Sequence, residues 1–502
     1  MDLLNDLPRG NPDKPKGKIP REFFERPEDV AGACAYDGST FMAGAYGPHL
    51  VGELTEQGRV ELAGAGGGKS VQLTSELIGY AGSAAVVDPK GELSRNVAAY
   101  RAEGLGHDVF CLDLGCGLPT NLAPYQARWN PLATCDPNKE DFLERIGLIA
   151  DGLIMQLPNT ETHWNDAAKE FLGGLMLLVV LCPLFEKKDL LTVHALLSTG
   201  YEDETRRGEH SVSSMDGVLD LMRHTARLNA ATYPAIVTRL KAAALSFAEK
   251  PDNERNSVLS TLRTQLTFLG YPEIQNVLAE SGTKAKTLHS TREIKQKKQT
   301  VFLCIPAGKL PLYGRVARMF INLLLTDLEA DKTTPAIPVA VVIEELPVIG
   351  FLKSVEVFSG YIRGCGGKFY LIAQNLGQLQ KTYPASWETM LANNVIHAYA
   401  NSDLTTLKYL EERLGKTAVE TISKNVTTQA ATGNETVSFG MHPLMTITEL
   451  SRTFSAIDAL HRQVIVWPGH GPIILQRVRF WDRDAPYARS FDPYWKFRST
   501  RP

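Results

Sequence analysis

The sequence of 502 residues has no long hydrophobic run, no paired cysteine motif and no excess of positive charge. Its most apolar run, residues 171–185, is interrupted by Pro183 and is shorter than the roughly 20 residues that a membrane-spanning helix needs. We therefore expect a buried core helix at this place. No signal peptide is visible, because residues 1–26 are polar and rich in proline. These absences predict a soluble chain without a transmembrane segment.

The cysteines and the charge narrow the possibilities further. Seven cysteines are scattered along the chain without a Cys-x-x-Cys pair, which offers neither a zinc site nor a disulfide framework. Their odd number fits a reducing cytoplasm. A net charge of −3 excludes a global basic field that attracts nucleic acid, so any DNA contact must come from local patches or from an assembled ring.

A glycine-rich segment with the sequence AGAGGGKS, residues 63–70, follows an apolar stretch. It matches the phosphate-binding pattern G-x-x-x-x-G-K-[ST], except that Ala63 replaces the first glycine. Successive glycines let backbone N–H groups converge on phosphate, and the following helix points its positive end at the same anion. We predict that Lys69 reaches the β- and γ-phosphates and that Ser70 is a Mg²⁺ ligand. A left-handed backbone at Ala63 would cost roughly 1 kcal/mol. The predicted nucleotide-binding residues are Gly64, Gly66, Gly67, Gly68, Lys69, Ser70 and Val71.

Strand and helix patterns divide the chain into two parts of an α/β domain around a helical insert. Apolar strand patterns occur at residues 84–87, 109–112, 301–305, 340–343, 369–373, 395–399 and 464–467. Their alternation with helices is typical of a mostly parallel sheet, whereas strand patterns are nearly absent between residues 133 and 283. We predict five parts: an extended or disordered N-terminal arm (1–45), a nucleotide-binding domain in two pieces (46–132 and 284–490), an inserted all-α domain (133–283) and a C-terminal tail (491–502).

Two glutamates follow the apolar strand at residues 340–343. Hydrolysis of ATP needs a carboxylate that organises the metal ion and a residue that orients water, both beside the phosphate-binding loop. We predict that Glu344 holds the Mg²⁺ shell and that Glu345 polarises the attacking water. Aspartate is more usual in the first place, so Glu344 is a second departure, although its longer side chain can act through a metal-bound water. The alternative is that both glutamates merely end a strand in solvent.

Two further residues are candidates for the same chemistry. Gln374 closes the strand at 369–373, at the edge of the sheet where ligands bind, and is expected to sense the γ-phosphate or position water. Arg363 precedes that strand and is a candidate arginine finger for the nucleotide of a neighbouring subunit. An ordinary strand-end glutamine and a surface arginine remain the alternatives.

The order of these segments resembles the type IV coupling proteins of the TraG-like class, which are ATPases of conjugation and type IV secretion. Each segment alone is weak, but their order over roughly residues 45–490 is specific. The matching segments are residues 63–70, 86–93, 129–132, 342–350, 369–379 and 468–481, with Trp164 opening the helical insert.

This resemblance implies a RecA-like P-loop NTPase domain that carries an all-α domain, assembles into a homo-hexamer and uses ATP and Mg²⁺. It implies that Lys69, Glu345, Arg363 and Gln374 are catalytic and that Ser70 and Glu344 bind the metal ion. The implied partners are DNA, a relaxase or relaxosome, and channel components of a type IV system at the inner membrane. The family usually begins with transmembrane helices, whereas none is visible in this sequence. We therefore expect this chain to be cytoplasmic and to lie at the inner membrane through a partner.

Alternatives to an ATP-driven transfer motor remain open at this stage. One is a nucleotide-gated adaptor that recruits a substrate and hydrolyses little ATP, and another is a general DNA translocase. A basic stretch adds a possible DNA path, although a solvated linker back to the sheet is the simpler interpretation. Its members are Lys284, Lys286, Arg292, Lys295, Lys297 and Lys298. No base-reading motif is present, so DNA binding should be sequence-tolerant.

Overall fold

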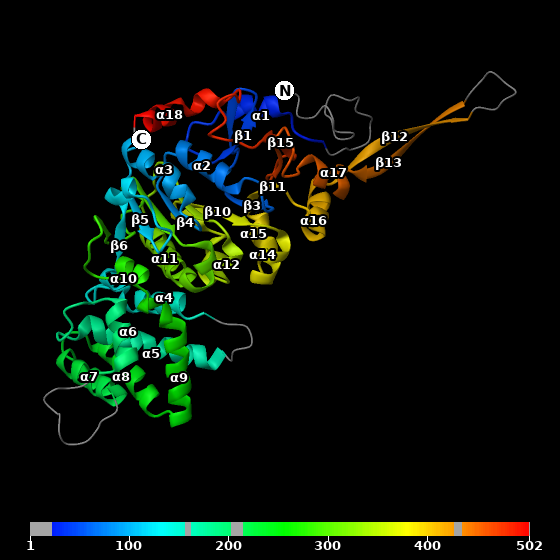
Figure 1. Ribbon diagram of the computed structural model, residues 1–502. Helices are drawn as coiled ribbons and strands as arrows, with labels where there is room; N and C mark the ends of the chain where they lie inside the picture. The colour runs from blue at the N-terminus through cyan, green and yellow to red at the C-terminus, as the bar shows by residue number, and fades with distance from the viewer. Residues whose placement is uncertain (1–22, 156–161, 202–213, 426–433, 501–502) are drawn as a thin grey trace. The chain divides into compact units, whose positions relative to one another are not determined.

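The computed structural model describes residues 23–155, 162–201, 214–425 and 434–500 (Figure 1). These residues fall into two compact units. The first unit belongs to residues 1–84, 100–106 and 335–502, and the second to residues 85–99 and 107–334.

The first unit is built on a mixed sheet with a parallel centre. In spatial order the central strands are β11 (Asn394–Tyr399), β3 (Gly58–Ala63), β10 (Gly367–Ala373) and β9 (Val339–Ile343), and all neighbours in this row are parallel. Every residue of these four strands is buried, as expected for parallel strands covered on both faces. Beyond β11 the sheet continues with antiparallel neighbours, namely β14 (Arg462–Val466), β15 (Ile473–Gln476), β1 (Met42–Tyr46) and β2 (His49–Gly52).

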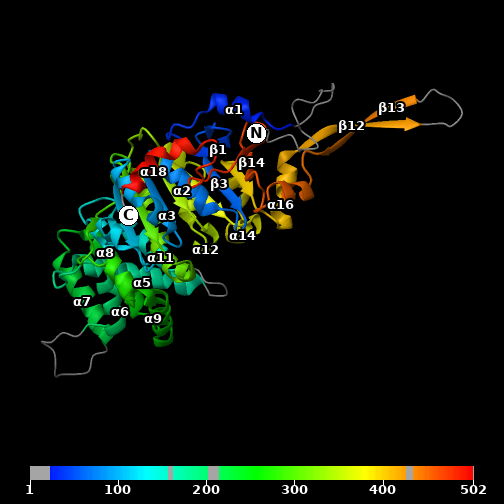
Figure 2. The same cartoon turned by 45° about the horizontal axis from the view of Figure 1, so that its top comes forward.

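Short helices precede, connect and follow the strands of this unit. They are α1 (Pro27–Ala33), α2 (Lys69–Gly79), α12 (Leu346–Ile349), α13 (Lys353–Phe358), α14 (Leu376–Thr382), α15 (Trp387–Ala392), α16 (Leu404–Leu414), α17 (Ile447–Thr453) and α18 (Asp492–Ser499). Strands β12 (Lys416–Asn425) and β13 (Asn434–Pro443) pair only with each other and form a long antiparallel ribbon that leaves the body of the unit (Figure 2).

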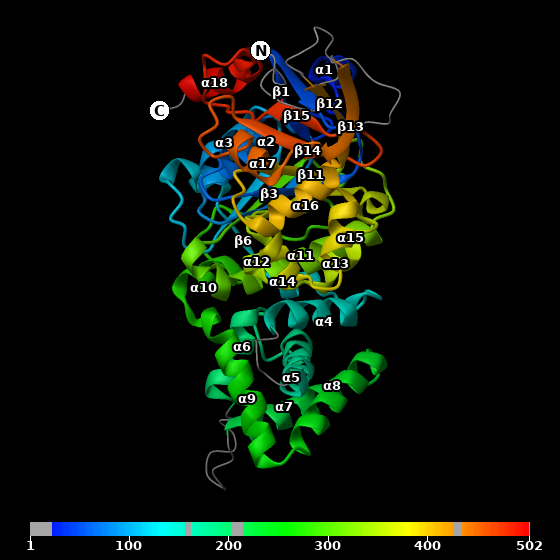
Figure 3. The same ribbon diagram turned by 90° about the vertical axis from the view of Figure 1, so that its right-hand side faces the viewer.

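The second unit combines a smaller group of strands with a helical bundle. Its strands β4 (Ala84–Asp88), β8 (Gln299–Cys304) and β5 (Asp108–Asp113) lie in this spatial order, and β5 and β8 are parallel. Helix α3 (Glu92–Glu103) follows β4, and β6 (Ala127–Trp129) pairs with β7 (Lys286–Leu288). The helices are α4 (Phe142–Leu153), α5 (Thr162–Leu181), α6 (Leu190–Thr199), α7 (Ser214–Leu228), α8 (Pro234–Ala248), α9 (Asp252–Leu266), α10 (Pro272–Leu278) and α11 (Leu310–Ala330). Figure 3 shows α5 to α9 gathered into one bundle.

Close packing joins α4 to α11 within the second unit. A side chain at Gly152 of α4 would place its Cβ 2.5 Å from the Cα of Met319 of α11, so only glycine permits this approach. Beside this contact, the buried guanidinium of Arg145 donates a 2.6 Å hydrogen bond to the carboxylate of Asp327. Because both charges are almost completely buried, each needs the other as a partner.

The observed elements include the predicted strands and helices, with differences at both ends of the chain. The predicted core helix at 171–185 lies largely within α5, and within the described part of the chain no helix is both long and apolar enough to cross a membrane. Residues 1–45 were expected to be an extended or disordered arm, but its described part contains α1 and the start of β1. The predicted tail contains α18, and the β12–β13 ribbon has no counterpart in the prediction.

Candidate functional site

The candidate site lies at the carboxyl ends of the four central parallel strands of the first unit. The glycine-rich loop follows β3, Glu344 and Glu345 follow β9, and Gln374 follows β10. Because parallel strands end at the same edge of a sheet, residues far apart in the sequence meet here.

The loop after β3 has the geometry of an anion-binding loop. Gly66 and Gly68 have left-handed φ values of +73° and +86°, which residues with a side chain rarely adopt. A side chain at Gly64 would collide with the carbonyl oxygen of Ala400, only 1.9 Å from the position of its Cβ. Ala63 is the last residue of β3 and is not among the residues with positive φ, so the strain expected there does not arise.

Lys69 begins helix α2 and forms an ion pair with Glu345. Its Nζ lies 3.0 Å from Glu345 Oε1, and both side chains are more than four-fifths buried. Gln374 Nε2 donates to both oxygens of the same carboxylate at 3.1 Å. Glu345 itself has a left-handed φ of 59°, a strained conformation of the kind that gathers at functional sites. These contacts bring three of the predicted catalytic residues into one cluster.

Ser70 and Glu344 form a second pair beside this cluster. The Ser70 hydroxyl donates to Glu344 Oε1 at 3.3 Å, and Glu344 is buried. A hydroxyl and a carboxylate are hard oxygen ligands of the type that Mg²⁺ prefers. The longer side chain of Glu344 thus reaches the serine of the loop, so the residues present fit a Mg²⁺ ion held between them.

The other two predicted residues lie apart from these contacts. Val71 is half-buried in the first turn of α2, where its N–H donates to the Gly68 carbonyl at 3.1 Å. Arg363 is exposed in the short turn before β10, where its carbonyl accepts from the Gly366 N–H at 3.0 Å. Its guanidinium forms no hydrogen bond or ion pair with another described residue. A role for Arg363 at the nucleotide of its own subunit is therefore not visible in the described contacts.

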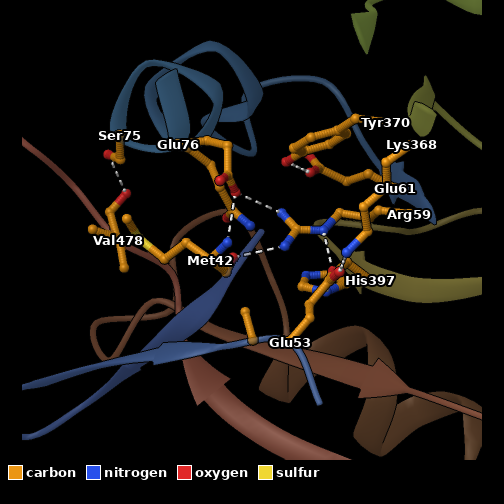
Figure 4. Close-up of polar contacts among 12 residues, drawn as sticks. Met42, Glu53, Arg59, Glu61, Ser75, Glu76, Lys368, Tyr370, His397 and Val478 are labelled. Carbon is orange, nitrogen blue, oxygen red and sulfur yellow. Dashed lines mark hydrogen bonds and ion pairs between the residues drawn. The ribbon is translucent and has the colours of Figure 1, made fainter. Parts of the chain in front are cut away.

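A buried charge network lies beside α2 and was not predicted (Figure 4). Arg59 of β3 donates to Glu53 at 2.8 Å and lies 3.5 Å from Glu76 of α2, while Lys368 of β10 donates to Glu53 at 3.1 Å. Burial raises the pKa of Glu76 to about 7, and the nearby Glu53 carboxylate adds to this shift. Burial and the positive charge of Arg59 lower the pKa of His397 to about 4.

A contact to the loop from the C-terminal part of the chain was also missed. Arg477 follows β15, and its guanidinium donates a hydrogen bond to the carbonyl of Gly67. These residues are 410 positions apart, and no motif in the sequence connects them.

Most of the basic stretch at residues 284–298 is engaged in contacts within the second unit. Lys284 donates to Gln126 at 2.7 Å, and Lys286 pairs with Asp108. Arg292 donates to Asp141 at 2.5 Å. Lys297 pairs with Glu293, and Lys295 donates to the carbonyl of Asp331. These contacts favour the linker interpretation over a free basic surface.

Comparisons with known proteins agree with this arrangement. The family model for Type IV secretory system Conjugative DNA transfer matches residues 28–500. A conjugal transfer protein TraG of Escherichia coli is 25% identical over 77% of this chain and 60% of its own length. The type IV secretion system-coupling protein VirD4 of Bartonella henselae is 21% identical over 84% of this chain and 62% of its own length. The chain thus spans about three fifths of these curated relatives.

Solved structures support the fold. The bacterial conjugative coupling protein TrwBΔN70, crystallised with sulphate, has a TM-score of 0.62 with 14% identity and covers 92% of this chain and 96% of its own. TrwB in complex with ADP and Mg²⁺ has a TM-score of 0.60 with 13% identity over the same share of both chains. The fold is that of a RecA-like NTPase with a mostly parallel sheet and an all-α part, as predicted from the sequence. On the match of the family model over nearly all of its length, the chain belongs to the type IV secretory system conjugative DNA transfer family.

Proposed function

We propose that this chain binds Mg·ATP at the loop after β3 and couples its hydrolysis to the transfer of DNA through a type IV secretion system. The observation that carries the proposal is the convergence of Lys69, Ser70, Glu344, Glu345 and Gln374 at one edge of the sheet. TrwB, which shares the fold, was crystallised with ADP and Mg²⁺ and with a non-hydrolysable ATP analogue.

Each residue of the site has a proposed task. Lys69 and the backbone N–H groups of Gly66, Gly68 and Ser70 bind the phosphates at the start of α2, where the helix N-terminus favours an anion. Gly64, Gly67 and Val71 shape the loop around the phosphates, because their N–H groups donate to the carbonyls of Tyr399, Gly64 and Gly68. Ser70 and Glu344 would hold Mg²⁺, which neutralises charge on the phosphate oxygens when bound. Glu345 polarises the attacking water, and Gln374 holds its carboxylate in place.

The ion pair between Lys69 and Glu345 implies that Lys69 changes its partner when a nucleotide binds. Binding of a γ-phosphate by Lys69 requires the ammonium to leave Glu345, which is then free to act on water while it stays bonded to Gln374. This exchange links nucleotide binding to activation of the base. It also favours the second candidate, a nucleotide-gated adaptor, because the same exchange can act as a switch without rapid turnover.

We further propose that Arg363 acts on the nucleotide of a neighbouring copy in a homo-hexamer. The residue is exposed, and it lies close in sequence to several exposed apolar side chains that suit a subunit interface. These side chains are Val348, Phe351, Val357 and Tyr361.

The wider setting follows from the family. The proposed partners are DNA without sequence preference, a relaxase or relaxosome, and channel components at the inner membrane, to which the chain attaches through a partner. The proposed domain limits keep residues 133–283 as the all-α domain between the two nucleotide-binding parts, and α4 to α10 lie within these limits.

The test compares purified full-length protein with two variants and one control. Lys69→Ala should lose affinity for Mg·ATP and all turnover, whereas Glu345→Gln should keep affinity and lose turnover. Lys381→Ala, which removes an exposed cation of α14, should behave like the wild type. Stimulation of turnover by single-stranded DNA separates a motor from an adaptor. Full ATPase activity in both site variants would contradict the proposal.

A further inference from the structure

A buried arginine, Arg477, donates a hydrogen bond to a backbone carbonyl of the glycine-rich loop. Arg477 is 6% exposed, and its Nη1 donates to the carbonyl of Gly67 while its Nε donates to the carbonyl of His461 at 3.2 Å. The backbone N–H of Arg477 donates to the same His461 carbonyl at 2.8 Å. Both ends of the residue are thus fixed to the turn before β14, so the guanidinium has little freedom to leave the loop.

The guanidinium also rests on an aromatic ring that touches the loop. Its centre lies 4.6 Å from the ring centroid of Tyr399, the last residue of β11. The Tyr399 hydroxyl donates to the carboxylate of Glu61 on β3, and its backbone carbonyl accepts from the N–H of Gly64 at 3.2 Å. A side chain at Gly67 would place its Cβ 3.0 Å from the Tyr399 ring. The loop is therefore held at Gly64 by Tyr399 and at Gly67 by Arg477.

The orientation of one peptide group follows from this contact. A trans peptide bond holds the C=O of one residue and the N–H of the next on opposite sides of the chain. Since the Gly67 carbonyl faces Arg477, the N–H of Gly68 faces away from Arg477. Gly66 and Gly68 both have left-handed φ values, and glycine peptides without Cβ atoms rotate easily. Without the hydrogen bond from Arg477, the peptide group between Gly67 and Gly68 is free to rotate and reverse the directions of its C=O and N–H.

We infer that Arg477 is a positioning residue that keeps the Gly68 N–H directed at the phosphates of a bound nucleotide. It acts through the Gly67 peptide group and does not itself contact the ligand. Within the described residues no carboxylate forms an ion pair with Arg477, and its Nη2 atom is buried without a hydrogen-bond partner. The carboxylates of Asp458 and Glu61 act on its charge electrostatically, so the hydrogen bond to the Gly67 carbonyl is what fixes the peptide group. This inference rests on the proposed nucleotide binding.

The experiment measures Mg·ADP affinity in the full chain carrying Arg477→Lys or Arg477→Gln. Lysine keeps the charge but loses the forked donor geometry that spans Gly67 and His461. Both variants should raise the Kd about tenfold, the value of one hydrogen bond in a charged site. Hydrogen exchange of the loop peptide, residues 63–70, should show that Mg·ADP protects it in the wild type and protects it much less in either variant.

A matched control is Arg101 of α3, which contacts the end of α2 farthest from the loop. Arg101 is fully buried and donates to the carbonyls of Leu77, Tyr80 and Gly82 at 2.7 to 2.9 Å. Arg101→Lys removes a comparable set of backbone contacts far from the loop, so it should lower the melting temperature without changing the Kd or the loop protection. Loss of affinity in this control as large as in Arg477→Lys would reduce Arg477 to a general structural role.

The outcomes separate the inference from the proposal beneath it. Wild-type affinity and loop protection in Arg477→Lys would overturn the positioning role, because the charge alone would then suffice. If the wild type itself failed to bind Mg·ADP, the proposed function would fail and the positioning role with it. If Arg477→Gln fails to fold, the comparison between Arg477→Lys and Arg101→Lys still decides the question.

Discussion

Replacement of Glu76 by glutamine should change how the stability of the protein depends on pH. Glu76 is 2% exposed on α2, and burial raises the pKa of its carboxyl group from 4.5 to about 7. In the unfolded chain this group loses its proton near pH 4.5, whereas in the folded protein it keeps the proton to near neutrality. The stability that Glu76 contributes is therefore highest at low pH and falls as the pH rises toward 7.

The size of the effect follows from the two pKa values. As the pH rises from 5 to 8, deprotonation of the buried Glu76 carboxyl lowers the free energy of unfolding by about 2.5 kcal/mol. Glutamine has no such titration. It keeps an oxygen for the 2.9 Å hydrogen bond from the Met42 N–H, while its amide nitrogen takes the place of Oε1, which has no hydrogen-bond partner. Placing an amide nitrogen where Oε1 lies lowers the stability of the variant, but by an amount that does not vary with pH.

Urea unfolding followed by circular dichroism at pH 5, 6, 7 and 8 measures the prediction. The stability of Glu76→Gln relative to the wild type should rise by about 2.5 kcal/mol from pH 5 to pH 8. The exposed Glu56→Gln serves as the control and should follow the wild type within about 0.5 kcal/mol at every pH. A constant difference between Glu76→Gln and the wild type across this range would refute the raised pKa.

Three further changes test separate parts of the structure. Gly152→Ala should destabilise the second unit by about 1–3 kcal/mol in calorimetry, because the new Cβ would lie 2.5 Å from Met319 Cα. Glu344→Asp should raise the Mg²⁺ concentration needed for turnover, since the shorter side chain moves away from the Ser70 hydroxyl, now 3.3 Å distant. Arg363→Ala should lower kcat by about a thousandfold while ATP affinity stays within twofold, and a normal kcat would exclude the finger role.

The central sheet was predictable because its strands are short, continuous apolar runs. Residues 339–343 and 367–373 are completely buried, and such runs have few alternatives to a parallel strand with both faces covered. The prediction of an extended or disordered arm at residues 1–45 was wrong for its described part, for the opposite reason. Helix α1 is only seven residues long and is stabilised by packing against β1 and β2, so its sequence alone carries little signal.

The β12–β13 ribbon shows a second limit of the sequence. Its strands pair in a continuous antiparallel register from Lys416 with Pro443 to Asn425 with Asn434. The segment is rich in threonine and serine and lacks the apolar alternation of a half-buried strand. Hydrophobic periodicity therefore gives no signal for this element, and the pairing of the backbone defines it.

Part of the candidate site followed from motifs, because each motif residue stands at the end of a strand or the start of a helix. Lys69, Glu345 and Gln374 could be brought together from that rule alone. The ion pair between Lys69 and Glu345 could not be predicted, because it depends on the directions of two side chains that are 276 residues apart in the sequence. The same holds for the network around Arg59, where each charge is tolerable only because its partners are buried with it.

The two departures from the usual motif have different physical meanings once the backbone is known. Ala63 stands in an extended, fully buried strand, so its methyl group meets no conformational penalty, and the left-handed positions fall on Gly66 and Gly68 instead. Glu344 adds one methylene, and that length is what carries its carboxylate to Ser70. A motif constrains residue types, whereas binding of phosphate requires that particular N–H groups and oxygens point to one place. The Gly67 carbonyl is held by Arg477, which lies outside the glycine-rich motif and 410 residues from it. Phosphate binding by the loop should therefore depend on the last strands of the sheet as well as on the loop's own glycines.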